Sequence, residues 1–136
     1  MIYSYSDKDQ IVDVNAGLVY NFDEVKTGCT VAHTAGTSVF TLARPGYYYV
    51  VVSASGAPSA AGDVQLTLYN GANAIPGATA LNTSTGTDDV VNLTIPAIIQ
   101  VRPSCCAVDN TVYLTVINTG SEATFANTAI TITKLA

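Results

Sequence analysis

Short alternating runs of β-branched, aromatic and small polar residues are the feature of this 136-residue sequence that most restricts its fold. Residues 63–69 alternate strictly: a valine and two leucines share one parity, and Gln65, Thr67 and Tyr69 share the other. A period of two places successive side chains on opposite faces of a β-strand. No segment shows a convincing 3.6-residue apolar spacing of an amphipathic helix. The chain is therefore predicted to be all-β.

Gly, Asn, Pro and Asp separate these runs and so predict the turns. The expected strands lie in residues 28–42 (one or two strands), 47–53, 63–69, 74–75, 90–101 with a bend at Pro96, 111–118 and 129–135, with a polar loop at 82–89. Residues 1–6 fit either a first strand or an anchor. A set of about eight to ten strands is typical of an antiparallel two-sheet jelly-roll sandwich. No linker or internal repeat interrupts the sequence, so residues 1–136 are expected to form a single jelly-roll domain.

The composition indicates a surface that is poor in charge. Only 11% of the residues are charged, against about 25% in an average soluble domain. Surfaces of this kind are usually buried against other copies or a partner. Tyr48, Tyr69, Tyr113 and Ile117 are expected to point outward from their strands, and a tyrosine combines a large apolar ring with a polar hydroxyl. We therefore expect these four residues to form an oligomer interface.

The distribution of charge excludes two classes of partner. The net charge is −5, and the five basic residues are single and far apart in the sequence: Lys8, Lys26, Arg44, Arg102 and Lys134. No basic stretch is available to neutralise phosphates, so nucleic acid is not an expected partner. The apolar runs are too short to cross a membrane, and the N-terminus lacks the features of a secretory signal. The protein is thus expected to be made in the cytoplasm.

No group of residues predicts catalysis or a cofactor. The only histidine, His33, has no carboxylate near it in the sequence, and a structural or surface role is the expected one. Asp7, Asp9 and Asp13 lack the central glycine and late glutamate of a calcium loop. The adjacent pair Asp88–Asp89 suits no glycosidase arrangement. We expect a non-enzymatic protein without a bound metal.

The three cysteines are Cys29, Cys105 and Cys106. Adjacent cysteines do not have the spacing that lets two thiolates share a zinc ion. An odd number without a secretory signal also argues against a planned disulfide framework. Two interpretations stay open: buried small apolar residues, which is the leading one, or a disulfide from Cys29 to Cys105 or Cys106.

Three segments, in order, resemble the jelly-roll heads of the tumour-necrosis-factor and complement type. Phe40–Tyr48 (FTLARPGYY) resembles a step of the TNF-like fold. Leu68–Gly71 (LYNG) with Ile75–Gly77 (IPG) resembles a hairpin in the heads of bacterial collagen-like surface glycoproteins, and Ala129–Leu135 (AITITKL) resembles their last strand. The resemblance implies a homotrimeric TNF-like jelly roll.

A narrower likeness links the chain to small proteins of tailed phages and prophages of gut Firmicutes. It rests on Pro103–Asn110 (PSCCAVDN), Thr27–Cys29 (TGC) and His33–Gly36 (HTAG). The implied role is a capsid decoration or head-fibre protein on the virion surface, bound to the major capsid protein or to a fibre base. Two alternatives are a receptor- or glycan-binding head and a bacterial or spore surface protein, although the collagen-like stalk of the latter is missing.

Overall fold

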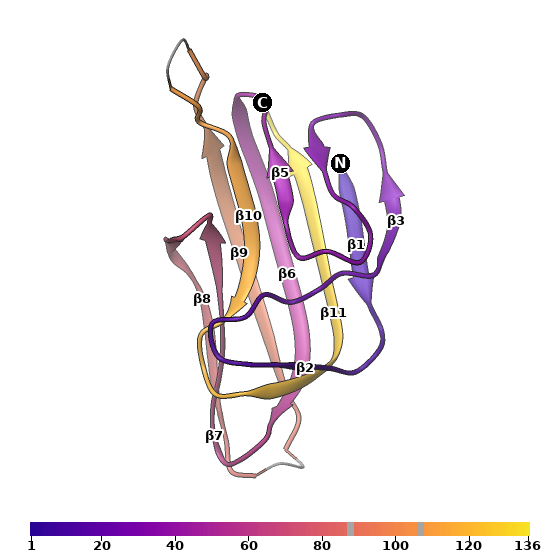
Figure 1. Cartoon of the computed structure of the whole chain (residues 1–136), viewed down its shortest axis with the longest axis vertical. Coiled ribbons are helices and arrows are strands. Elements are labelled where there is room, and N and C mark those ends of the chain that lie inside the picture. The colour runs from indigo at the N-terminus through magenta and orange to yellow at the C-terminus, as the bar shows by residue number, and fades with distance from the viewer. Residues whose placement is uncertain (87–88, 106–107) are drawn as a thin grey trace.

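The computed structural model describes residues 1–86, 89–105 and 108–136. Within these residues the chain forms eleven β-strands and no helix, and hence no helix that could cross a membrane. The strands build two antiparallel sheets that face each other, and both termini lie at the same end of the sandwich (Figure 1). The expectation of an all-β, two-sheet antiparallel sandwich is confirmed.

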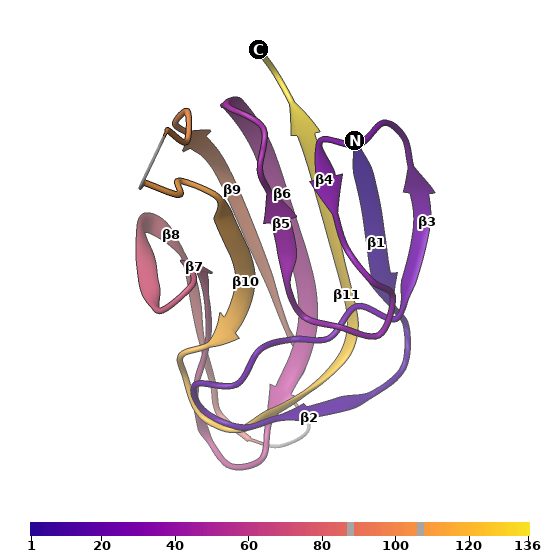
Figure 2. The same ribbon diagram turned by 45° about the horizontal axis from the view of Figure 1, so that its top comes forward.

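The first sheet, sheet A, has the strand order β3-β1-β11-β6-β9, with β2 paired to β11. Its strands are β1 (Ile2–Ser6), β2 (Gln10–Val12), β3 (Phe22–Lys26), β6 (Gly46–Pro58), β9 (Val91–Val101) and β11 (Ala123–Lys134). The second sheet, sheet B, has the order β4-β5-β10-β7-β8. Its strands are β4 (Val31–Ala32), β5 (Phe40–Leu42), β7 (Gly62–Asn70), β8 (Asn73–Ser84) and β10 (Val112–Asn118). Figure 2 shows β5 and β10 of sheet B lying in front of β6 and β9 of sheet A.

The core fills the space between the two sheets and follows the alternation seen in the sequence. Val64, Leu66 and Leu68 of β7 are buried, and so are the alternate apolar residues of β10. Burial of such a side chain contributes about 1.5–3 kcal/mol. Tyr20 is also fully buried, with its hydroxyl 3.0 Å from Thr128 Oγ1, and burial raises the pKa of the Tyr20 hydroxyl. The buried hydroxyl therefore has the partner that it requires.

Two predictions about β8 are wrong. The strand was expected to be short and to end near Pro76–Gly77, with a polar loop from residue 82, but it runs continuously from Asn73 to Ser84. Gly77 takes a left-handed φ of 79°, and the register of β7 against β8 shifts there. Because β8 is the edge strand of sheet B, its outer side has no ladder for a proline to interrupt. Pro96 is tolerated in β9, the edge strand of sheet A, for the same reason.

The N-terminal segment is the first strand. β1 lies between β3 and β11, and it pairs with β11 from Ile2↔Ile132 to Ser6↔Thr128. Its pairing joins the two ends of the chain in the middle of sheet A. The consequence is a broad sheet face that combines residues from the beginning, the middle and the end of the sequence.

Candidate interaction surface

The outer face of sheet A is almost free of charge. Among all the residues of β1, β6, β9 and β11, only Lys134 is charged, and it lies at the last position of β11. The outward residues align in rows across the strands: Tyr49 pairs with Ile98 and Thr133, and Val51 pairs with Pro96 and Thr131. When water is removed from a face built from hydroxyl, amide and apolar groups, the large cost of desolvating a charge is avoided.

Aromatic side chains are concentrated on this face. Five aromatic residues in the described part of the chain are more than a third exposed, and four of them point outward from sheet A: Tyr3 (37%), Phe22 (41%), Tyr47 (48%) and Tyr49 (41%). Tyr5 stacks on Phe22 with ring centroids 5.2 Å apart and lies 6.1 Å from the Tyr3 ring. Aromatic residues are enriched at protein interfaces, so this face has the composition of an interface.

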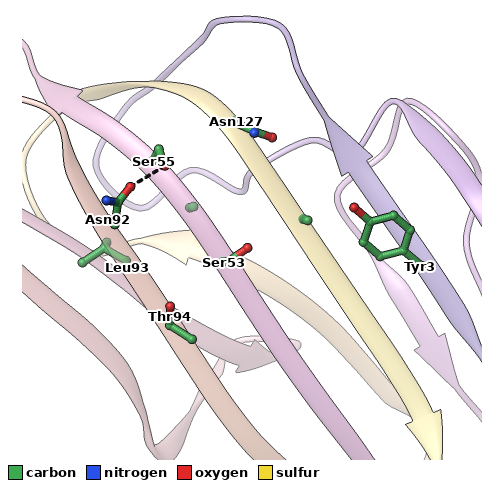
Figure 3. A pocket seen from close by; sticks show the side chains of 9 residues that line it. Tyr3, Ser53, Ser55, Asn92, Leu93, Thr94 and Asn127 are labelled. Carbon is green, nitrogen blue, oxygen red and sulfur yellow. Dashed lines mark hydrogen bonds between the residues drawn. The ribbon is translucent and has the colours of Figure 1, made fainter.

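A shallow hollow of about 330 Å³ lies near the middle of the face. Figure 3 shows Tyr3 of β1 on one side of it and the side chains of β6 and β9 on the other. Its polar lining consists of amides and hydroxyls, including the Ser55 hydroxyl, which donates to Asn92 Oδ1 over 2.6 Å. The lining holds no carboxyl, imidazole, amine or thiol side chain. Its amides, hydroxyls and one aromatic ring are groups that can form binding contacts.

The structure separates the four residues that were expected to form an oligomer interface. Tyr48 does not point outward: its side chain is fully buried, and its hydroxyl donates to the Arg44 carbonyl over 2.7 Å. Tyr48 has the same parity as the buried valines of β6, and so it belongs to the core. Tyr69, Tyr113 and Ile117 lie on the outer face of sheet B, where Tyr113 is 45% exposed and the other two are half-buried. Their interface role remains a prediction.

His33 has a structural environment. Its ring is buried, stacks on Phe40 at 4.0 Å between centroids, and places Nδ1 2.6 Å from Asp23 Oδ1 and Nε2 3.0 Å from the Thr37 carbonyl oxygen. Asp23 Oδ1 also accepts a hydrogen bond from the Ser4 hydroxyl over 2.5 Å. Ser4 and Asp23 belong to sheet A, whereas His33 follows β4 of sheet B, so this cluster ties the two sheets together.

The expectation that the cysteines are buried is wrong for the two that the structure describes. Cys29 and Cys105 are both exposed, because both lie in loops at the end of the sandwich that holds the termini. Cys29 is a free thiol whose Sγ accepts a hydrogen bond from the Arg44 guanidinium over 2.9 Å. Cys106 lies outside the described residues, and the disulfide remains a prediction.

We expect the Cys29 thiol to react with a thiol reagent in the folded protein, because its sulfur is exposed beside a guanidinium. Mass spectrometry of the labelled native protein, digested without reductant, measures this directly. A Cys29→Ser variant that takes up the same amount of label under native conditions would contradict the prediction. Recovery of a Cys29 peptide linked to another cysteine would instead establish the disulfide.

Within residues 1–86, 89–105 and 108–136, no three His, Cys, Asp or Glu side chains lie close enough together to hold a metal ion. Asp7, Asp9 and Asp13 are all exposed. Asp88, the first member of the adjacent acidic pair, lies outside the described residues. The described part of the chain therefore offers a broad uncharged surface for binding, and its polar clusters have structural environments.

The fold is a TNF-like jelly roll, and solved structures support this class. The chain superimposes on the Eiger TNF of S. frugiperda with a TM-score of 0.72 and 15% identity, over 99% of this chain and 92% of that one. The PRD1 vertex protein P5 aligns with a TM-score of 0.55 and 12% identity, over 95% and 93% of the two chains. Murine APRIL aligns with a TM-score of 0.53 and 9% identity, over 98% of each chain. No protein-family model and no curated protein matches the sequence.

Proposed function

We propose that this protein is a non-enzymatic structural subunit that forms a homotrimer through the outer face of sheet A. In this proposal the trimer decorates a tailed-phage virion, either on the capsid or as the head of a fibre. The observation that carries the proposal is the concentration of exposed aromatic residues on a face whose strands β1, β6, β9 and β11 carry no charged residue except Lys134 at the end of β11. The resemblance to TNF-like heads supports three copies.

The physical reason for self-association is the large apolar and aromatic area that a single copy leaves in water. Burial of apolar surface contributes about 25 cal/mol per Å², and stable interfaces bury on the order of 800 Å² on each partner. Three strands of this face are long, with 11 to 13 residues in β6, β9 and β11. Their outer face therefore offers a continuous surface for packing against a second copy.

The virion location has two supports. The segments Pro103–Asn110 and His33–Gly36 resemble proteins of tailed phages, and a vertex protein of phage PRD1 shares the fold over most of both chains. A trimer that touches the particle through each subunit attaches firmly even where one contact is weak. Purified protein is expected to co-sediment with undecorated capsids of the same phage. A lack of binding at micromolar concentration would contradict the decoration role and leave the self-association intact.

The Tyr49→Glu substitution tests the interface. We expect the wild-type protein to have a native mass close to three times 14.1 kDa and the variant to run as a 14.1 kDa monomer. The new carboxylate would face Ile98 and Thr133 in the middle of a desolvated interface. Light scattering after size-exclusion chromatography measures the mass, and circular dichroism checks that the variant is folded.

Tyr113→Glu is the matched control, because Tyr113 has a similar exposure but lies on the outer face of sheet B. It is expected to leave the trimer intact. The opposite pattern, with Tyr113→Glu monomeric and Tyr49→Glu trimeric, would place the interface on Tyr69, Tyr113 and Ile117. A monomeric wild-type protein would overturn the proposed homotrimer.

A glycan-binding head is the second candidate, and the hollow beside Tyr3 favours it. An aromatic ring next to amides and hydroxyls is able to stack on a sugar and bind its hydroxyl groups. The two candidates exclude each other, because a trimer built on this face covers the hollow. A glycan-array signal from a monomeric protein that disappears in Tyr3→Ala would establish the glycan-binding function in place of the trimer.

A further inference from the structure

The basic residues are far apart in the sequence, yet the fold brings four of the five to one end. Arg44 lies two residues before Gly46, and Arg102 follows Val101, the β9 residue that pairs with Gly46. The Lys134 ammonium reaches the same place, since a Cβ on Gly46 would lie 2.9 Å from Lys134 Nζ. The fourth, Lys26, is the last residue of β3 and pairs with Ile2 at the start of β1. We call this end, defined by Lys26, Arg44, Arg102 and Lys134, the basic end.

The opposite end of the sandwich is acidic. Among the residues that the structure describes, its exposed carboxylates are those of Asp7, Asp9, Asp13, Asp63, Asp89 and Glu122, and its only basic residue is Lys8. Contacts between loops hold part of this set together: the Ser121 amide donates to the Asp63 carbonyl, and the Ser59 hydroxyl donates to Glu122 Oε1. Figure 1 shows that these loops lie at the far end of the long axis from the two termini. We call this set the acidic end.

Two exposed acidic side chains lie toward the basic end, and they do not reverse its sign because four basic side chains outnumber them. Glu24 is exposed on β3. Hydrogen bonds from the Thr111 hydroxyl and amide, at 2.6 Å and 3.0 Å, hold the pKa of Asp109 below its usual range. The Asp109 carboxylate therefore keeps its negative charge and is counted as one. The molecule carries charges of opposite sign at its two ends, although its net charge is −5.

We propose that copies of this protein stack end to end, with the basic end of one copy on the acidic end of the next. Complementary charges favour and orient such an encounter. The two contacting surfaces are different, so the contact does not close on itself and extends into a linear stack. It leaves the outer face of sheet A free, and it therefore goes beyond the side-by-side trimer proposed above.

Sedimentation velocity at low and at high salt concentration tests the stacking. At about 0.01 M ionic strength, charges act over roughly 30 Å. The mean mass is then expected to rise with protein concentration to multiples of the mass of the unstacked unit. At about 1 M, where the range falls to roughly 3 Å, the stacks should dissociate to that unit. A mass that does not depend on salt would overturn the proposal.

Two charge reversals with the same change in net charge show which end is responsible. Arg102→Glu is expected to abolish the rise in mass at low salt, whereas Lys8→Glu, at the acidic end, is expected to preserve it. Combining Arg102→Glu with Glu122→Arg restores the net charge but weakens the charge of both ends, and it is expected to leave stacking abolished. Equal effects of Arg102→Glu and Lys8→Glu would mean that the rise in mass depends only on net charge, and would reject the end-to-end contact.

The same experiment keeps the two proposals apart. The mass at about 1 M salt reports the side-by-side unit, because apolar contacts are not screened. A monomer at high salt that still forms stacks at low salt would reject the trimer and support stacking. A trimer that never grows at low salt would support the trimer and reject stacking.

Discussion

Replacing Gly120 with alanine will lower the free energy of unfolding by about 3 kcal/mol, at the upper end of the range for overpacking a tight site. An alanine Cβ at this position would lie 2.6 Å from the Asp63 carbonyl oxygen and 2.7 Å from the Gln65 amide nitrogen. Both atoms belong to the backbone of β7, so no side-chain rotation can relieve the overlap. Urea denaturation followed by circular dichroism measures the change.

The control for this substitution is Gly86→Ala. An added Cβ at Gly86 meets nothing within 4 Å, and its backbone is not left-handed. Alanine there is expected to change the free energy of unfolding by no more than about 0.5 kcal/mol. Equal stabilities of the two variants would show that the turn between β10 and β11 yields without strain, which would contradict the tight approach of Gly120 to β7.

The sequence predicted the fold well because alternation determines which residues face the core. In β7 and β10 every second residue is apolar, and the expected faces are the observed ones. In the run Tyr47–Tyr49 and the valines that follow, no polar residue marks the outer side. The pairing of β6 with β9 and β11 determines which side of β6 faces the core, and it places Tyr48 inward. The predicted interface failed at Tyr48 for that reason.

The candidate surface and the charged ends depend on contacts between distant parts of the chain. Tyr3 and Thr131 are adjacent on sheet A although 128 positions of sequence separate them. Arg44 and Arg102 approach each other only through the pairing of Gly46 with Val101. Spacing along the sequence carries no information about either contact. The sequence therefore predicted self-association, but it could not predict which face of the sandwich takes part.

Asp23→Asn will destabilise the protein by about 2–3 kcal/mol, because it leaves the buried His33 ring without its anionic partner. Both nitrogens of His33 face oxygen acceptors, the Asp23 carboxylate and the Thr37 carbonyl. These two oxygens fix the position of the ring. Asp23 Oδ1 also accepts a hydrogen bond from the Ser4 hydroxyl. An asparagine replaces this charged acceptor with a weaker, neutral one.

A double-mutant cycle separates the pair from its surroundings. Asp23→Asn, His33→Gln and the combined variant are compared by urea denaturation, with Glu24→Gln as a control that removes an exposed carboxylate from the same strand. The coupling between Asp23 and His33 is expected to exceed about 1 kcal/mol, because the two side chains are in direct contact. Additive effects would mean that each residue acts alone. A measurable coupling would mean that the contact between Asp23 and His33 stabilises the join between β3 and the segment after β4.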